Sequence, residues 1–333
     1  MKETFRGIAV KVLVYNGALN EKHIQEIEEA SKKAGVELCF TSSENDIPEG
    51  FEDSEVVYGY GMNLVNADKI RGNKNLKWIS MISAGIDYAL KPGFFANENV
   101  IITNSSGTYG VTIAEHIIAV SLMMMRKLTL TYASSLQGKW GSLSMQKSLK
   151  DCHITVLGTG DIGTCFAKRV KAFEPAEIIG VSRSGKNQDP VYDKMYSVDQ
   201  LDEVLPGTEL LVMSLPGTTE TEGILSRERI SLLPEGAYVV NVGRGSAIDY
   251  DALMESLNSE RLGGAALDVF KVEPLPEDSP LWTTKNILIT PHSAGNLTLD
   301  YTRDKNVHQF CENLMNYVEG KPLQHVVDKV QGY

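Results

Sequence analysis

The stretch that decides the fold is "ITVLGTGDIG" at residues 154–163. Its first four residues are apolar or β-branched and predict a buried strand, and a helix-forming sequence follows the last glycine. Gly158, Gly160 and Gly163 have the G-x-G-x-x-G spacing, which permits a tight turn, a close approach of a pyrophosphate and close packing of helix on strand. The phosphates then lie at the positive end of the helix that begins near Asp161 and Ile162. The strand, the loop with Thr159 and the helix together predict a dinucleotide site.

The residues after the next strand indicate which dinucleotide binds. An acidic side chain about 20 residues beyond the glycines usually binds the adenosine ribose. Here Ser182, Arg183 and Ser184 follow the apolar strand, and no Asp or Glu occurs between Glu177 and Asp189. A 2′-phosphate favours hydroxyl donors and a guanidinium, whereas a solvated basic turn is the alternative interpretation. We predict NADP(H) in preference to NAD(H).

Size and composition limit the class of protein. A chain of 333 residues favours two domains, and its 42% hydrophobic and 23% charged residues are typical of globular proteins. The net charge of −11 argues against nucleic-acid binding, and no apolar run has the roughly 20 residues of a membrane span. The four cysteines form no CxxC pair, and no signal-peptide cleavage site is present. We expect a cytoplasmic protein with reduced thiols and no metal site.

Apolar strands alternate with helical segments in two series along the chain. This pattern predicts an α/β fold of two Rossmann-like, doubly wound parallel-sheet domains with a cleft between them. Residues 105–295 form the expected dinucleotide-binding domain. Residues 1–104 plus 296–333 form a discontinuous, flavodoxin-like substrate-binding domain, because the last helix is expected to return to the first sheet. A helix expected over 110–136 is apolar on most faces and suits a domain junction or subunit interface.

Three charged side chains follow neighbouring strands of the second series. Arg244 follows "AYVVNVG", Glu273 follows "GGAALDV" by a few residues, and His292 follows "NILITP". Ligands of open α/β sheets bind outside the carboxyl ends of the strands, so the three could converge. Each residue taken singly fits an ordinary surface charge equally well. His116, in the apolar helix, is expected to be a hydrogen-bonded core histidine.

Several ordered segments closely resemble the D-isomer-specific 2-hydroxyacid dehydrogenase family. They are "LGTGDIG" (157–163), "LPGTTETEGIL" (215–225), "NVGRGSAID" (241–249), "ALDVFKVEPLP" (266–276) and "TPHSAG" (290–295). In addition, "ISMISAGID" (79–87) resembles the family's substrate loop, and residues 108–127 resemble its domain-crossing helix. The resemblance covers the chain from end to end.

The resemblance implies reduction of a 2-oxo acid to a D-2-hydroxy acid. Arg244 would hold the substrate carboxylate and C2 carbonyl oxygen, His292 would be the general acid, and Glu273 would orient His292. The remaining roles are binding roles. Backbone amides at Ala84, Gly85 and Ile86 would bind the substrate carboxylate, Asp268 would contact the nicotinamide carboxamide, and Leu215, Pro216 and Val242 would line the cofactor groove.

The serine-arginine-serine turn resembles the NADPH-using glyoxylate/hydroxypyruvate reductase branch of the family. We expect no regulatory domain after residue 333, which would make phosphoglycerate dehydrogenase a poorer match. Two alternatives stay open, an NAD-dependent phosphoglycerate-type dehydrogenase and a dinucleotide-sensing, corepressor-like binding protein. The family resemblance also implies a homodimer formed through the nucleotide-binding domain.

Overall fold

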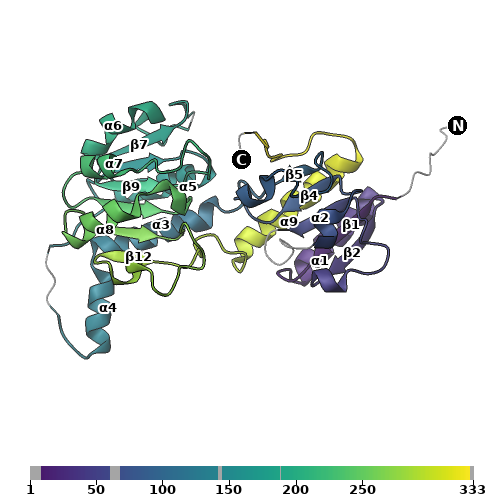
Figure 1. Cartoon of the computed structure of the whole chain (residues 1–333), viewed down its shortest axis with the longest axis horizontal. Coiled ribbons are helices and arrows are strands. Elements are labelled where there is room, and N and C mark those ends of the chain that lie inside the picture. The colour runs from purple at the N-terminus through teal and green to yellow at the C-terminus, as the bar shows by residue number, and fades with distance from the viewer. Residues whose placement is uncertain (1–8, 61–67, 142–144, 188, 331–333) are drawn as a thin grey trace. The chain divides into compact units, whose positions relative to one another are not determined.

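The computed structural model describes residues 9–60, 68–141, 145–187 and 189–330. The chain divides into two compact units (Figure 1). Unit 1 comprises residues 1–108 and 296–333, and unit 2 comprises residues 109–295. Both are parallel-sheet α/β units, which confirms the predicted fold class.

Unit 1 contains, among its described residues, a five-stranded parallel sheet in the order β2-β1-β3-β4-β5. The strands are β1 (Lys11–Tyr15), β2 (Glu37–Thr41), β3 (Val56–Tyr60), β4 (Trp78–Met81) and β5 (Ile101–Thr103). The helices are α1 (Glu21–Ala34), α2 (Asp68–Gly72) and α9 (Asp300–Val318). The last helix ends before Gly320, whose φ of 67° suits the left-handed position after a helix.

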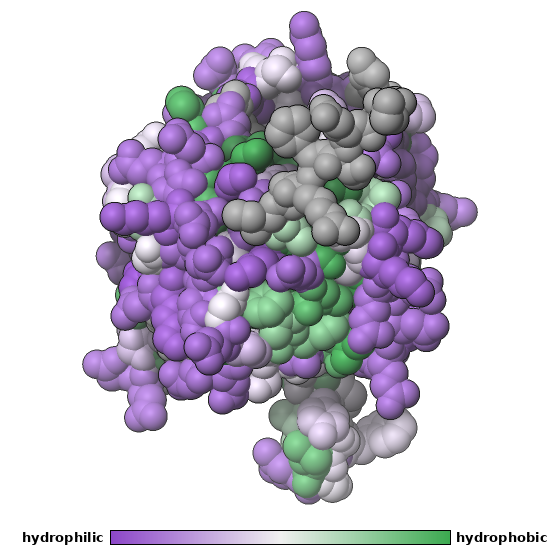
Figure 2. Space-filling view, turned by 90° about the vertical axis from the view of Figure 1, so that its right-hand side faces the viewer, coloured by the Kyte–Doolittle hydropathy of each residue, from purple (hydrophilic) through white to green (hydrophobic). Residues whose placement is uncertain are grey.

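Helix α9 returns to the first sheet and covers one of its faces together with α1 (Figure 1). Phe310 stacks on Tyr58 and Trp78 with ring centroids 4.3 and 5.5 Å apart, and Tyr317 stacks on Trp78 at 5.5 Å. Alternate strand residues, among them Leu13, pack into a separate cluster. Figure 2 shows a largely hydrophilic face of the molecule with a smaller hydrophobic area within it.

Unit 2 contains, within the part of the chain that is described, a seven-stranded parallel sheet in the order β12-β11-β10-β9-β6-β7-β8. The strands are β6 (His153–Leu157), β7 (Glu177–Ser182), β8 (Lys194–Ser197), β9 (Leu210–Met213), β10 (Tyr238–Asn241), β11 (Gly264–Leu267) and β12 (Ile287–Ile289). The helices are α3 (Gly110–Met125), α4 (Leu128–Leu136), α5 (Asp161–Val170), α6 (Leu201–Val204), α7 (Arg227–Leu232) and α8 (Tyr250–Asn258). Strand β8, at the edge of the sheet, is not predicted from the sequence.

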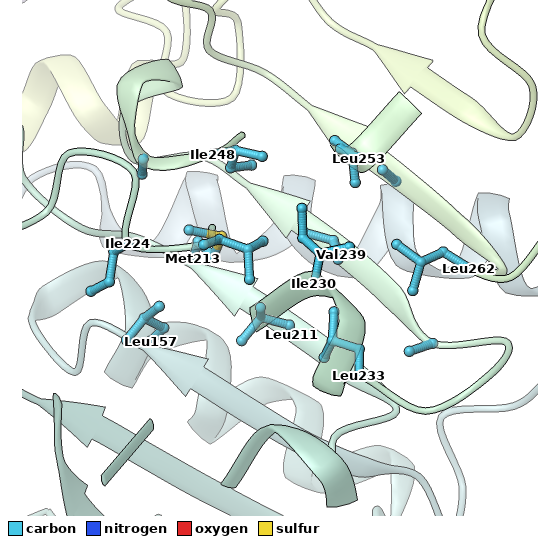
Figure 3. Close-up of a cluster of buried hydrophobic side chains, with 14 of the residues drawn as sticks. Leu157, Leu211, Met213, Ile224, Ile230, Leu233, Val239, Ile248, Leu253 and Leu262 are labelled. Atoms are coloured by element: carbon cyan, nitrogen blue, oxygen red, sulfur yellow. The ribbon is translucent and has the colours of Figure 1, made fainter. Parts of the chain in front are cut away.

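Both faces of this sheet are buried, which explains its continuous apolar strands. On one face, Leu157, Leu211 and Val239 pack against Ile230 of α7 and Leu253 of α8 (Figure 3). On the other face, α3 contacts β10 and β11 and α5 contacts β6. The sheet is therefore fixed on both sides, and the loops at its carboxyl edge are presented on a rigid support.

The prediction of one continuous helix over residues 110–136 is wrong, because this segment forms two helices. Helix α3 ends at Met125, Lys127 adopts a left-handed φ of 53°, and α4 begins at Leu128. The two parts also differ in environment. Met124 and Met125 are buried, whereas no residue of α4 is buried.

Candidate active site

The carboxyl ends of β6, β9, β10, β11 and β12 are neighbours along one edge of the sheet. Glycines let the loops at this edge lie against each other. A Cβ at Gly158 would lie 2.8 Å from the carbonyl oxygen of Ser214, and one at Gly243 would lie 2.6 Å from backbone atoms of Leu215. Gly245 packs directly on the backbone of Phe270. These contacts join the loop that carries Arg244 to the loop that carries Glu273.

His292 and Glu273 are in direct contact, as the sequence-based hypothesis requires. The Nδ1 atom of His292 lies 2.7 Å from Oε2 of Glu273. The other carboxylate oxygen accepts a hydrogen bond of 2.7 Å from the backbone N–H of Phe270, which fixes the carboxylate. The imidazole is about half exposed, with 53% of its side-chain area accessible. Since Nδ1 faces the carboxylate, Nε2 is the nitrogen directed to any reacting molecule.

The backbone of His292 is held in an unusual conformation. Its φ of 49° lies in the left-handed region, which a non-glycine residue adopts only when its surroundings enforce it. The N–H of His292 donates to the carbonyl oxygens of Asp268 at 2.8 Å and Thr290 at 3.0 Å. The Asp268 side chain, which is only 3% exposed, accepts hydrogen bonds from Thr290 Oγ1 at 2.5 Å and from the N–H groups of Ser293 and Ala294 at 2.9 and 3.0 Å. Asp268 therefore holds the turn on both sides of His292.

Arg244 follows β10, next to β11 in the sheet. It is partly buried, and its Nη1 atom donates to the carbonyl oxygen of Gly243 at 2.9 Å. Its aliphatic stem passes close to Gly217, where an added Cβ would lie 3.2 Å from Cγ of Arg244. The side-chain amide of Asn241 binds the carbonyl oxygen of Arg244 at 2.9 Å, which fixes the backbone at this position.

The glycine loop between β6 and α5 fits a dinucleotide pyrophosphate. Gly160 is the residue before α5, and an added Cβ there would meet nothing within 4 Å, so the space over the helix N-terminus is open. Gly163 packs against the carbonyl oxygen of Gly158 and Val156, which brings the helix onto the strand. The carbonyl oxygen of Thr159 accepts a hydrogen bond of 2.9 Å from Asn187 Nδ2. Asp161 and Ile162 form the first turn of the helix, and the Asp161 carboxylate lies against Gly110 of α3.

The turn after β7 places a cation where a ribose-binding acid would otherwise stand. Strand β7 ends at Ser182, and Arg183 and Ser184 are exposed directly after it. Gly185 adopts a φ of 68° and closes the turn through a hydrogen bond of 3.3 Å to the carbonyl oxygen of Ser182. The pKa of the Glu220 carboxyl is lowered by hydrogen bonds from the backbone N–H of Glu220 and from Thr218. The positive charge of Arg183 contributes to the same lowering. Arg183 is thus within electrostatic reach of the loop after β9.

The remaining predicted cofactor residues lie at the same edge of unit 2. Leu215 and Pro216 follow β9 and are partly buried, whereas Val242 follows β10 and is 8% exposed. The carbonyl oxygen of Pro216 accepts a hydrogen bond of 2.7 Å from Thr221 Oγ1, which stabilises this loop.

The predicted substrate loop belongs to unit 1 and follows β4. Asn104 Nδ2 binds the carbonyl oxygen of Ala84 at 2.8 Å, and Ile86 is buried with its carbonyl oxygen bound to the N–H of Ala89 at 2.8 Å. Gly85 lies between these two fixed points. Ser83 directly precedes Ala84. Its Oγ atom is buried and has no hydrogen-bond partner among the described residues.

Two contacts at this edge were not predicted. The imidazole of His116 lies 3.3 Å from Thr290 Oγ1, and Asn187 links the turn after β7 to the glycine loop. The sequence carries a signal for neither contact, since both join residues far apart in the chain. His116 was expected to be a hydrogen-bonded core histidine. It is hydrogen-bonded, but its side chain is 19% exposed, so it lies at the margin of the core and not within it.

Comparison with known proteins identifies the family. The family model described as "D-isomer specific 2-hydroxyacid dehydrogenase, NAD binding domain" matches residues 118–294. An uncharacterised protein of Corynebacterium melassecola is 32% identical over 78% of this chain and 84% of its own length. Glyoxylate/hydroxypyruvate reductase A of Salmonella choleraesuis is 29% identical over 78% and 83% of the two chains. D-3-phosphoglycerate dehydrogenase of Methanocaldococcus jannaschii is 29% identical over 92% of this chain but 59% of its own length.

Solved structures agree with this assignment. A family member from Aeromonas salmonicida has a TM-score of 0.83 and 29% identity, covering 96% of this chain and 99% of that one. An NADPH-dependent glyoxylate/hydroxypyruvate reductase of Sinorhizobium meliloti, solved with NADP and sulfate, has a TM-score of 0.77 and 26% identity, covering 97% and 99%. None of the described helices is long and apolar enough to cross a membrane. The predicted enzyme class is confirmed, and the chain belongs to the D-isomer specific 2-hydroxyacid dehydrogenase family.

Proposed function

We propose that this protein reduces a small 2-oxo acid of the glyoxylate/hydroxypyruvate type to the D-2-hydroxy acid, using NADPH. The observation that carries the proposal is the pairing of His292 with Glu273 at 2.7 Å, at the carboxyl edge of the same sheet in which β10 leads to Arg244 and β6 leads to the glycine loop. When bound, the reduced nicotinamide supplies a hydride, and the residues of the chain supply binding, charge stabilisation and the proton.

His292 would deliver that proton from Nε2. As hydride reaches C2, negative charge develops on the carbonyl oxygen, and a positioned imidazolium can neutralise it by proton transfer. Glu273 accepts the Nδ1–H and stabilises the positive charge on the ring before transfer. In the oxidative direction the neutral imidazole would act as the base.

Arg244 would bind the substrate carboxylate and the C2 carbonyl oxygen, because a guanidinium provides several donors in a fixed plane. Backbone amides at Ala84, Gly85 and Ile86 would bind the same carboxylate from unit 1. The buried hydroxyl of Ser83 supports a polar ligand at this loop, because a buried hydroxyl without a partner is unfavourable.

The glycine loop at 158–163 would hold the pyrophosphate, and Leu215, Pro216 and Val242 would line the nicotinamide side, with Asp268 near the carboxamide. Ser182, Arg183 and Ser184 would bind the 2′-phosphate, which favours NADPH over NADH. The exposure of Arg183 and Ser184 supports this assignment, since both can reach a phosphate without breaking a buried contact. The structure of the Sinorhizobium meliloti reductase with NADP is a parallel in a relative.

We also propose a homodimer formed through unit 2. No residue of α4 is buried, and Leu128, Leu130, Tyr132 and Leu136 are 48%, 54%, 67% and 71% exposed. Apolar side chains gathered on one short helix are typical of a protein interface. A second copy of the chain is the partner that fits, because each copy would present the same helix to a two-fold axis.

The decisive experiment is a panel of 2-oxo acids assayed with NADPH and with NADH. We expect oxidation of NADPH with glyoxylate or hydroxypyruvate to be faster than oxidation of NADH. Turnover of 3-phosphoglycerate with NAD and little response to the 2′-phosphate would instead support the phosphoglycerate-type alternative. Tight dinucleotide binding without turnover across the panel would support the corepressor-like alternative.

A further inference from the structure

A network of hydrogen bonds behind His292 connects the turn at residues 290–294 to helix α3. The turn is held by Asp268, whose carboxylate binds Thr290 Oγ1 and two backbone N–H groups. His116, on α3, lies beside Thr290, with its Nε2 atom 3.3 Å from Thr290 Oγ1 and 4.0 Å from Asp268 Oδ1. All of these residues belong to unit 2.

The donors and acceptors of this network determine the tautomer of His116. A carboxylate can only accept, and Asp268 already accepts from Ser293 and Ala294, so the single hydroxyl hydrogen of Thr290 is given to Asp268. The oxygen of Thr290 must then accept from His116. His116 therefore carries a hydrogen on Nε2, in a chain of hydrogen bonds that runs from the imidazole through the hydroxyl to the carboxylate.

The same face of α3 supports the end of the turn. A Cβ added at Gly295 would lie 3.0 Å from side-chain atoms of both Tyr109 and Ile113. Tyr109, Ile113 and His116 are spaced by four and three residues, so they lie on one side of the helix. The turn that carries His292 is thus packed against α3 at Gly295 and hydrogen-bonded to it at Thr290.

We propose that His116 is a positioning residue for His292, acting through Thr290 and Asp268. His292 has a left-handed backbone, which is retained only while the turn around it is fixed. Proton transfer requires the imidazole to be placed within a fraction of an ångström, so loosening the turn should slow turnover more than it weakens cofactor binding. This inference rests on the proposed acid role of His292.

The test uses the full chain and three variants. H116L removes the donor with little change in volume, T290V removes the hydroxyl, and H116Q keeps an N–H donor at similar reach. We expect H116L and T290V each to lower kcat about tenfold with less than a twofold change in KM for NADPH, and H116Q to stay within about threefold of the parent. The double variant H116L/T290V should be no slower than the slower single variant, because the two residues act in series.

A matched control is H23L in unit 1. His23 is a fully buried histidine of unit 1, and its Nε2 bonds to Asp304 of the same unit at 2.8 Å. We expect H23L to lower the melting temperature and leave kcat unchanged at temperatures where the protein is folded. If H116L behaves in the same way, His116 has a purely structural role and the proposal fails.

Nuclear magnetic resonance of the histidine rings gives a second readout that does not need substrate. We expect an Nε2–H tautomer for His116, and shifted ring signals of His292 in H116L and T290V but not in H116Q. An Nδ1–H tautomer for His116, or unchanged His292 signals in H116L, would overturn the proposal. Shifted signals in a protein that reduces no 2-oxo acid would uphold the positioning role and reject the proposed function instead.

Discussion

At the scale of single residues, the contrast between His292 and His116 explains how one fold supports two kinds of histidine. His292 is half exposed beside a carboxylate, as a group that exchanges protons with a ligand must be. His116 is mostly buried, and burial lowers its pKa, although the charge of Asp268 acts in the opposite direction. One imidazole is available for chemistry, and the other is kept neutral as a donor.

Replacing His292 by Ala should lower turnover by roughly 10²- to 10⁴-fold, the usual contribution of a general acid or base. Replacing Glu273 by Gln should have a smaller effect, because the amide oxygen can still accept the Nδ1–H while the charge is lost. The measurement is kcat with saturating NADPH, together with NADPH binding by fluorescence to show that the cofactor site is intact. Near-normal turnover of the alanine variant would remove His292 from the mechanism.

Replacing Arg183 by Ala should raise KM for NADPH about 10- to 100-fold and change KM for NADH little, because a hydrogen bond to a charged group contributes about 1.5–3 kcal/mol. The matched variant is E220Q, which removes a negative charge within electrostatic reach of Arg183. We expect E220Q to lower KM for NADPH slightly. Equal effects of the Arg183 substitution on both cofactors would contradict a 2′-phosphate site.

The lowered pKa of His116 has a defined consequence for stability. The unfolded chain binds a proton near the ordinary pKa of 6.5, whereas the folded protein binds it only at lower pH. The free energy of unfolding should therefore fall as the pH falls from above 6.5 through the folded pKa. In H116Q this contribution is absent. The decrease in the free energy of unfolding from about pH 7.5 to about pH 5.5, measured by urea unfolding, should therefore be smaller than in the parent protein. An identical loss in the two proteins would show that His116 titrates normally.

At the scale of elements, the helix expected over 110–136 shows where sequence patterns lose information. Apolar residues stand on both sides of Arg126 and Lys127, and neither Gly nor Pro marks the break at Lys127. The buried half and the exposed half have similar composition, so only the packing of α3 against β10 and β11 distinguishes them. Strand β8 was missed for the related reason that an edge strand of mixed polarity, Lys194–Ser197, lacks the apolar run of its neighbours.

The exposed side chains of α4 provide a test of the homodimer. Replacing both Leu130 and Tyr132 by Glu should convert a dimer into a monomer, because two charges cannot be buried in an apolar interface without a partner. Sedimentation velocity measures the mass, and V330E is the control, since Val330 is 95% exposed in unit 1. A parent protein that sediments as a monomer would exclude the dimer directly.

The strands and the candidate site were more predictable than the helices. Continuous apolar runs predict buried parallel strands, and the carboxyl ends of such strands converge whatever the details of the loops. The strand ends predicted that Glu273 and His292 could converge, the family resemblance implied their pairing, and their contact is observed. The contact of His116 with Thr290 could not be predicted, because it depends on how α3 packs on the sheet.

At the scale of the whole molecule, the two units differ in how the chain builds them. Unit 2 is one continuous segment, residues 109–295, whereas unit 1 needs both ends of the chain. The segment 109–295 expressed alone should fold cooperatively and bind NADPH, because its core and glycine loop are internal to it. Thermal unfolding and fluorescence titration provide the measurement. A fragment that is unfolded in isolation would show that unit 2 depends on unit 1 for stability.

Helix α9 belongs to unit 1 but follows unit 2 in the chain, so unit 1 can complete its fold only after unit 2 has been synthesised. Residues 1–108 leave the ribosome before unit 2, yet Tyr58 and Trp78 gain their stacking partners, Phe310 and Tyr317, only after unit 2 has been translated. Until then an aromatic surface of the nascent first sheet stays uncovered while the intervening segment completes its own fold. Truncated translation products should consequently be the species that chaperones retain and proteases remove.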